Sequence, residues 1–228
     1  MSKNLLKRSI TSIILLLMLL IINFSHQYIF IISIIILCAI ICMEANNMYL
    51  KLLRSQSFKK NLISNKFNLK FLGLNIITFF YIFFIFCIFS YEIHNTSPIS
   101  FLYVVSICFF TDIGGYIFGN IIGGKKLSKI SPNKTISGTI GSFVFSIIPL
   151  LIIINVGILN LEFNLNNILF SLLISLISQL GDLFISYIKR KAQIKDTGKI
   201  LPGHGGVLDR VDGIIFAVPF SYFLLKLF

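Results

Sequence analysis

The chain has 228 residues, of which 56% are hydrophobic and only 12% are charged, and its mean hydropathy is +0.92. Soluble domains carry about 25% charged residues. The composition therefore excludes an ordinary soluble globular domain and favours an integral membrane protein. The length predicts a single membrane domain over residues 1–228 rather than several domains.

The net charge is +12, from 20 Lys and Arg against 8 Asp and Glu. In a soluble protein such an excess would suggest a nucleic-acid partner, but membrane proteins gather Lys and Arg in their cytoplasmic loops. We therefore expect the lipid bilayer as a partner and no nucleic acid. Substrates that carry phosphate groups would use the same charges.

Long apolar runs predict an all-α, polytopic bundle of about seven transmembrane helices, since a spanning helix needs roughly 20 apolar residues. The runs cover residues 9–24, 28–43, 71–91, 98–118, 137–158, 167–188 and 213–228. The first two and the last are short for a span. We expect N-terminal spans in residues 1–110 and a catalytic part in residues 111–228.

The basic residues predict the orientation of these spans. All but one of the 20 Lys and Arg precede the first span or fall in the connections 44–70, 119–136 and 189–212. Because Lys and Arg mark the cytoplasmic side, the N-terminus and these three connections are expected there. The sequence thus predicts a multi-pass protein of the cytoplasmic (inner) membrane with its active site facing the cytoplasm.

Acidic residues are scarce, and five of the eight lie at or beyond the cytoplasmic ends of the last four predicted spans. These are Asp112, Asp182, Asp196, Asp209 and Asp212. Ionisable groups within spans are costly and usually face a cavity or a partner. The alternative for Asp112 and Asp182 is an Asp–Lys ion pair that closes a helix end, with Lys189 as the serious candidate for Asp182.

The sixth predicted span carries a polar face. Its members are Ser171, Ser175, Ser178, Asp182, Ser186 and Lys189, spaced three or four residues apart. Packing of small residues against another helix is the alternative for the three serines.

Asp209 and Asp212 are three residues apart and are predicted to share a helical face, with helix capping as their alternative. With Asp182 they suit Mg²⁺, which prefers oxygen ligands and binds with substrate phosphates.

Residues 195–206 are too rich in Gly and Pro to form a helix. Consecutive backbone N–H groups in such a loop can bind an anion. Four bases surround it in the sequence: Lys189, Arg190, Lys195 and Arg210. This pattern predicts phosphate chemistry with a metal ion, and a basic loop that binds anionic lipid headgroups is the alternative.

Residues 186–212 read SYIKRKAQIKDTGKILPGHGGVLDRVD and resemble the signature of the phosphatidate cytidylyltransferase (CDP-diglyceride synthase) family. The matching positions are Ser186, Lys189, Arg190, Lys195, Asp196, His204, Gly205, Gly206, Asp209, Arg210 and Asp212, with Gln179, Gly181 and Asp182 upstream. Residues 111–141 resemble the middle segment of the family at Asp112, Tyr116, Gly119, Ser131, Pro132, Lys134, Thr135 and Gly138. Ile136 and Ser137 depart from the Trp-Glu that the family commonly has there.

This resemblance implies transfer of CMP from CTP to phosphatidic acid, which gives CDP-diacylglycerol and pyrophosphate for phospholipid biosynthesis. It implies that Asp182, Asp209 and Asp212 hold Mg²⁺ and that Lys189, Arg190, Lys195 and Arg210 bind phosphates. The whole catalytic group that it implies is Asp182, Lys189, Arg190, Lys195, Asp196, His204, Asp209, Arg210 and Asp212. His204 is expected either to contact a phosphate or base or to fix the loop. Ser131, Lys134, Asp112, Gly205 and Gly206 are the expected substrate-binding residues.

Two other functions fit parts of the sequence. One is a related nucleotidyltransferase or kinase that acts on another lipid. The other is a non-enzymatic anion transporter, which would carry charges near the middle of the membrane, whereas the acids here lie toward one side. A homodimer is a further assembly that the sequence allows.

The charge distribution makes a prediction about topology. A reporter enzyme fused after Phe228 should be active only outside the cytoplasm, because Lys226 is the one basic residue assigned to that side. A fusion within the 119–136 connection should report the cytoplasmic side and is the internal control. Cytoplasmic activity of the Phe228 fusion would show that the number of spans is even rather than odd.

Overall fold

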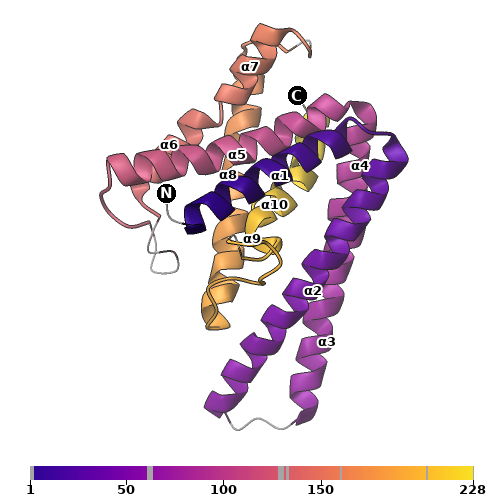
Figure 1. Ribbon diagram of the computed structural model, residues 1–228, viewed down its shortest axis with the longest axis vertical. Coiled ribbons are helices and arrows are strands. Elements are labelled where there is room, and N and C mark those ends of the chain that lie inside the picture. The colour runs from indigo at the N-terminus through magenta and orange to yellow at the C-terminus, as the bar shows by residue number, and fades with distance from the viewer. Residues whose placement is uncertain are drawn as a thin grey trace. The chain divides into compact units, whose positions relative to one another are not determined.

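The computed structural model describes residues 3–60, 64–127, 131, 134–159, 161–203 and 205–227. Within these ranges the chain is helical, with no β-strand and two isolated β-bridges. The elements, drawn in Figure 1, are α1 (Lys3–Asn23), α2 (Gln27–Lys60), α3 (Ser64–Phe80), the π-helix η1 (Tyr81–Phe86), α4 (Cys87–Thr96), α5 (Pro98–Ile121), α6 (Ile136–Phe145), α7 (Ile148–Val156), α8 (Leu165–Lys191), α9 (Leu208–Val211) and α10 (Ile214–Leu227).

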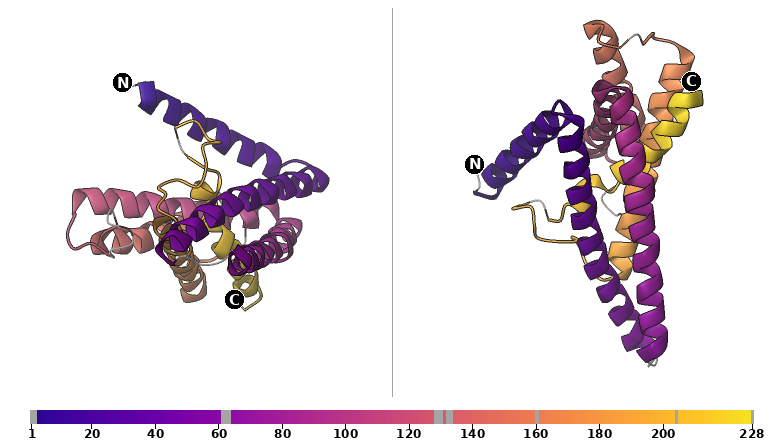
Figure 2. Two further views of the ribbon diagram at one scale, coloured as in Figure 1. Left: turned by 90° about the horizontal axis from the view of Figure 1, so that it is seen from below. Right: turned by 90° about the vertical axis from the view of Figure 1, so that its right-hand side faces the viewer.

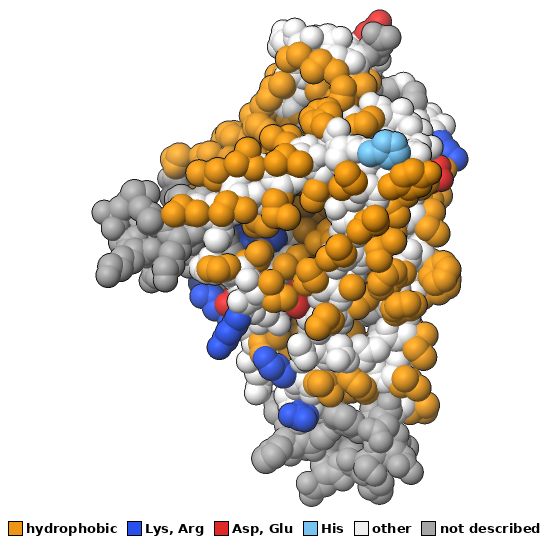
Figure 3. All heavy atoms as spheres, turned by 45° about the vertical axis from the view of Figure 1, so that its right-hand side comes forward, with side chains coloured by type: hydrophobic (Ala, Val, Ile, Leu, Met, Phe, Trp, Pro, Cys, Tyr) orange, Lys and Arg blue, Asp and Glu red, His pale blue; other side chains and the backbone are white. Residues whose placement is uncertain are grey.

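Five helical segments are long and apolar enough to cross a membrane. They are Gln27–Ser55, Leu69–Thr96, Pro98–Ile121, Ile136–Val156 and Leu165–Lys191. Hydrophobic side chains cover much of the face seen in Figure 3, as expected where lipid is the solvent. The predicted all-α, polytopic membrane fold is thereby confirmed. The count of seven stays a prediction, because the apolar part of α1 (Ile10–Asn23) and the 14 residues of α10 are shorter than a typical span.

The predicted loop over residues 44–70 is wrong. Helix α2 continues to Lys60 and α3 begins at Ser64. The stretch 44–60 contains neither Gly nor Pro, so nothing in it stops a helix where the apolar run ends. Glu44 consequently lies inside α2, within the segment that could cross the membrane.

Packing divides the chain into two compact units. The first comprises Met1–Tyr91 and Ile188–Val211, and the second comprises Glu92–Tyr187 and Asp212–Phe228. In the first unit α2 and α3 lie side by side and run in opposite directions (Figures 1 and 2). A hydrogen bond of 2.7 Å between the hydroxyls of Tyr49 and Thr78 links them. Helix α9 also packs against α2.

In the second unit the backbones of α5 and α6 approach closely. A Cβ atom on Gly141 would lie 2.7 Å from the carbonyl oxygen of Gly114, and one on Gly138 would lie 2.8 Å from that of Gly115. Small residues let membrane helices pack with their backbones in contact. Gly114, Gly115, Gly138 and Gly141 therefore serve the packing of these two helices.

The serines on the polar face of α8 belong to the same packing. Ser171 shares a hydrogen bond of 2.9 Å with the hydroxyl of Tyr103, and Ser175 accepts one of 2.9 Å from Thr111. Both serines and Ser178 are buried. Their role is to join helices by hydrogen bonds inside the bilayer, which agrees with the packing alternative for the three serines.

The α5–α6 contact leads to a prediction about stability. Gly141→Ala should lower the free energy of unfolding by about 1–3 kcal/mol, because the added methyl overlaps Phe118 and the backbone of Gly114. Gly73→Ala is the matched control, since a Cβ there meets nothing within 4 Å. Thermal unfolding of both variants in detergent would check this, and equal effects would contradict the close packing.

Candidate active site

The segment between α8 and α9 forms a loop in the first unit, as its Gly and Pro content predicts. Leu201 and Gly205 exchange backbone hydrogen bonds of 2.9 and 3.2 Å, which close a tight turn. Gly203 and Gly205 adopt φ angles of 78° and 87°, a region that favours glycine. His204, one of the predicted site residues, lies outside the described residues.

Asp209, in α9, ties the two ends of this loop to α8. Its Oδ1 accepts a hydrogen bond of 2.9 Å from Lys189 Nζ, and its Oδ2 accepts backbone N–H bonds from Thr197 (2.8 Å) and Gly206 (3.0 Å). The Lys189–Asp209 ion pair is largely buried. Removing one partner of a buried pair typically costs about 3–5 kcal/mol. Asp209 is therefore a structural acceptor at the centre of the loop.

Glu44 is a second buried carboxylate that holds the loop. It is 3% exposed. Its Oε1 accepts from Val207 N (3.1 Å), and its Oε2 accepts from Leu208 N (2.8 Å) and Thr197 Oγ1 (3.1 Å). The sequence interpretation missed this residue. The available signal was that Glu44 is the sole acid in the first 91 residues and follows directly after an apolar run.

The glycines of the loop fit around these two carboxylates. A Cβ on Gly206 would lie 2.6 Å from Glu44 Oε2, and a Cβ on Gly198 would lie 2.9 Å from Glu44 Cδ. A Cβ on Gly205 would lie 3.1 Å from Asp209 Oδ2. Gly205 and Gly206 are expected substrate-binding residues, and the structure gives a reason for glycine at both positions, namely the space that the two carboxylates occupy.

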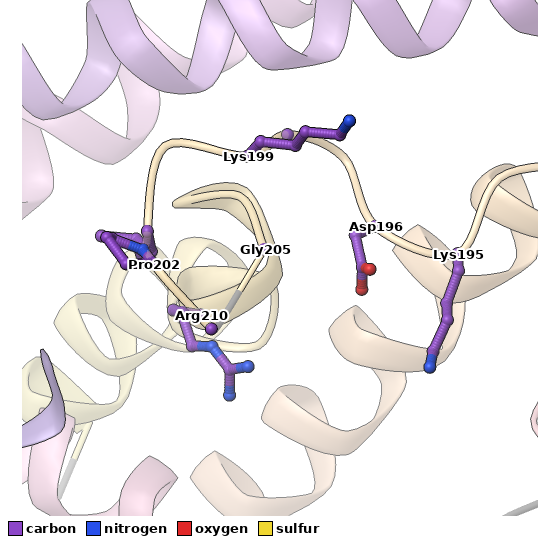
Figure 4. A pocket seen from close by; sticks show the side chains of 9 residues that line it. Lys195, Asp196, Lys199, Pro202, Gly205 and Arg210 are labelled. Atoms are coloured by element: carbon purple, nitrogen blue, oxygen red, sulfur yellow. The ribbon is translucent and has the colours of Figure 1, made fainter. Parts of the chain in front are cut away.

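The loop borders an open pocket of about 610 Å³ in the first unit. Its lining consists of Lys195, Asp196, Gly198, Lys199, Leu201, Pro202, Gly203, Gly205 and Arg210. In Figure 4 the side chains of Lys195, Asp196 and Arg210 extend to the same side of the loop, and Lys199 lies apart at its top. Three cations against one acid make the pocket suited to an anion with several charges.

Two predicted site bases of α8 lie outside this lining. Lys189 is engaged by Asp209, and Arg190 is exposed, with its guanidinium 3.5 Å from the carbonyl oxygen of Ile194. Both are near the C-terminal end of α8, where positive side chains interact favourably with the helix dipole.

A separate acidic cluster in the second unit centres on Asp182 of α8. Its carboxylate forms an ion pair with Lys134 and accepts a hydrogen bond of 3.1 Å from the Ser186 hydroxyl. The Asp212 carboxyl group lies within hydrogen-bonding reach of it. The Asp–Lys alternative for Asp182 is therefore realised, but with Lys134 as the partner. The Lys189 pairing is wrong, because Lys189 binds Asp209.

The prediction that Asp209 and Asp212 share a helical face is also wrong. Helix α9 ends at Val211 and α10 begins at Ile214, so Asp212 lies between two helices, where it accepts a hydrogen bond of 3.0 Å from Gly213 N. A Cβ on Gly213 would lie 2.9 Å from the carbonyl oxygen of Ser178. Gly213, between the ends of α9 and α10, thus lies directly against the backbone of α8.

Two predicted substrate-binding residues remain. Ser131 accepts a backbone hydrogen bond of 3.1 Å from Lys134 N, so it helps to place Lys134 beside Asp182. Asp112 is exposed on α5. The structure brings together Lys134, Asp182, Ser186 and Asp212 in one unit and the loop residues in the other.

Comparison with known proteins identifies relatives of this chain. The model of the cytidylyltransferase family matches residues 47–228. Among curated proteins, the phosphatidate cytidylyltransferase of Bacillus subtilis (strain 168) is 42% identical over 141 residues, which cover 60% of this chain and 52% of the relative. The phosphatidate cytidylyltransferase of Staphylococcus haemolyticus (strain JCSC1435) is 45% identical over 129 residues, which cover 54% of this chain and 48% of the relative. That of Staphylococcus aureus (strain COL) is 44% identical over 142 residues, which cover 60% of this chain and 53% of the relative. The chain thus spans about half the length of the curated relatives that it matches.

Proposed function

Because this chain belongs to the cytidylyltransferase family, we propose that it transfers CMP from CTP to phosphatidic acid. A phosphate oxygen of the lipid attacks the α-phosphorus of CTP, the bond from that phosphorus to the bridging oxygen breaks, and pyrophosphate leaves. The products are CDP-diacylglycerol and pyrophosphate. The observation that carries the proposal is the basic pocket lined by residues of the segment 195–210, which we call the signature loop, together with the names of the relatives.

The pocket has the size and charge that the phosphates of CTP require. Its volume of about 610 Å³ falls within the roughly 300–1,000 Å³ of small-molecule sites. Lys195, Lys199 and Arg210 would neutralise the triphosphate. The attacking phosphate monoester has a second pKa of ~6 and is mostly ionised near neutral pH, so the reaction needs charge neutralisation and positioning more than a strong base.

The residues around Asp182 fit a divalent cation. Asp182 and Asp212 are neighbouring carboxyl groups, and in this structure Lys134 supplies a positive charge beside Asp182. The Ser186 hydroxyl adds a third oxygen. No group of three or more His, Cys, Asp or Glu suited to a metal occurs among the described residues, but Mg²⁺ accepts water and substrate phosphates as its remaining ligands.

We accordingly place the proposed Mg²⁺ on Asp182 and Asp212. When bound, it would neutralise phosphate charge. The predicted third ligand, Asp209, already accepts three hydrogen bonds within the loop, and we assign it to holding the loop. Lys134 would move from Asp182 to a substrate phosphate when the metal binds.

The membrane helices suit the two substrates that we propose. Phosphatidic acid lies in the bilayer, and CTP is dissolved in the cytoplasm. The pocket bases Lys195, Lys199 and Arg210 belong to the connection that the charge distribution assigns to the cytoplasmic side. A site there would meet both substrates.

The chemistry can be tested with labelled nucleotide. With phosphatidic acid and Mg²⁺, CTP labelled at the α-phosphorus should give a labelled lipid, whereas CTP labelled at the γ-phosphorus should give labelled pyrophosphate and no labelled lipid. The reason is that, of the three phosphorus atoms of CTP, only the α-phosphorus passes to the lipid, as part of CMP. Lipid labelled from the γ position would identify a kinase, and label on other lipid phosphates but not on phosphatidic acid would identify a different acceptor.

The metal site can be tested at Asp182. Asp182→Asn keeps the size of the side chain and removes the charge, so a lost Mg²⁺ ligand should reduce kcat by about 100-fold or more, with partial recovery at high Mg²⁺. Folding should persist, because the Lys134–Asp182 pair is partly solvent-exposed and such pairs contribute little. Activity and thermal unfolding would be compared with Glu162→Gln, an exposed carboxylate outside the site. Near-normal activity, or loss only through unfolding, would exclude Asp182 as a ligand.

A further inference from the structure

Glu44 is an unusual residue for its position. It lies in the helix segment Gln27–Ser55, which is long and apolar enough to cross the membrane, and only 3% of its surface is exposed. A buried carboxylate in such a segment is costly unless it is paired or hydrogen-bonded. The three hydrogen bonds from Thr197, Val207 and Leu208 supply that compensation.

These bonds attach the signature loop at both of its ends. Thr197 lies near the start of the loop, and Val207 and Leu208 lie where α9 begins. The first N–H groups of a helix have no partner inside the helix, and a carboxylate that accepts them is favoured by charge as well as by hydrogen bonding. Glu44 thereby fixes where α9 starts, and Arg210 of the pocket follows two residues after Leu208.

The loop is shaped to admit this carboxylate. Gly198 and Gly206, from opposite ends of the loop, lie so close to Glu44 that a Cβ on either would overlap it. Gly198 also lines the pocket. The absence of side chains at Gly198 and Gly206 therefore leaves the space that the Glu44 carboxylate fills.

We propose that Glu44 is a positioning residue, which holds loop 195–210 of the first unit in the conformation that receives the phosphates of CTP. This inference rests on the proposed function. Residue 44 lies outside residues 47–228, which match the family, so the match assigns it no role. Glu44 acts through the loop backbone and does not itself contact substrate.

The contact can be measured without any enzymatic assay. In purified protein, Glu44→Gln replaces one acceptor oxygen by an N–H donor, so hydrogen exchange of the amides in 196–208 should accelerate by about tenfold or more. Exchange in α5 and α6 should not change. Glu162→Gln is the matched control and should leave both regions unchanged. Unaltered exchange in 196–208 would overturn the proposal.

Kinetics separate a positioning role from a merely structural one. Glu44→Gln should raise KM for CTP by about tenfold or more, change KM for phosphatidic acid by less than about twofold, and leave the protein folded. Glu44→Asp retains the charge and should recover part of the affinity for CTP. Equal effects on both KM values, or a loss of activity that follows the loss of folded protein in both variants, would overturn the positioning role.

A double-mutant cycle tests the geometry and remains informative even if Glu44→Gln is unstable. Gly198→Ala should weaken CTP binding in the otherwise unchanged protein, because its methyl overlaps the Glu44 carboxylate. In a Glu44→Ala background that space is vacant, so the same substitution should have a smaller effect on the Kd for CTP. The same factor in both backgrounds would contradict the inferred contact.

Failure of this inference can be distinguished from failure of the proposed function. If the unchanged protein makes CDP-diacylglycerol but Glu44→Gln keeps its KM for CTP, only the role of Glu44 is overturned. If the unchanged protein neither binds CTP nor makes CDP-diacylglycerol, the proposed function is overturned and the nucleotide role of Glu44 with it.

Discussion

The loop between α8 and α9, which lines the basic pocket, depends on two buried carboxylates. Glu44 accepts three hydrogen bonds and Asp209 accepts three, and Thr197 donates to both, through its hydroxyl and its backbone N–H. A basic, glycine-rich segment has little tendency to order by itself, since its charges repel and its backbone is unconstrained. Buried negative charge and backbone hydrogen bonds together offset both costs.

The few acidic residues of this chain have two different roles. Glu44 and Asp209 are buried acceptors for loop backbone and, in one case, for Lys189. Asp182 and Asp212 adjoin each other and are more accessible, with Lys134 as the neighbouring cation. An acid whose oxygens are all engaged by fixed donors stabilises structure, whereas adjacent carboxyl groups with a displaceable partner favour binding of a cation.

Local patterns in the sequence predicted the membrane helices and the Gly/Pro loop, because hydropathy and backbone preference act over short stretches. They failed at the end of one helix and for contacts between residues distant in the chain. The apolar run ending at residue 43 marks a change in polarity, and α2 continues past it as a helix. The Lys134–Asp182 pair, the Lys189–Asp209 pair and the role of Glu44 join segments that no periodicity connects, so only the packed structure could reveal them.

The double engagement of Thr197 has a consequence for how the loop can respond to a ligand. Both ends of the loop are bound to the carboxylates of Glu44 and Asp209. Thr197 makes these contacts at one end of the loop, and Gly206 to Leu208 make them at the other. The distance between the ends is therefore set by the protein interior. Any closure around the proposed nucleotide must therefore come from backbone rotation between these attachment points, at Gly198 to Gly203 and at Gly205, while Thr197 and Gly206 to Leu208 stay in place.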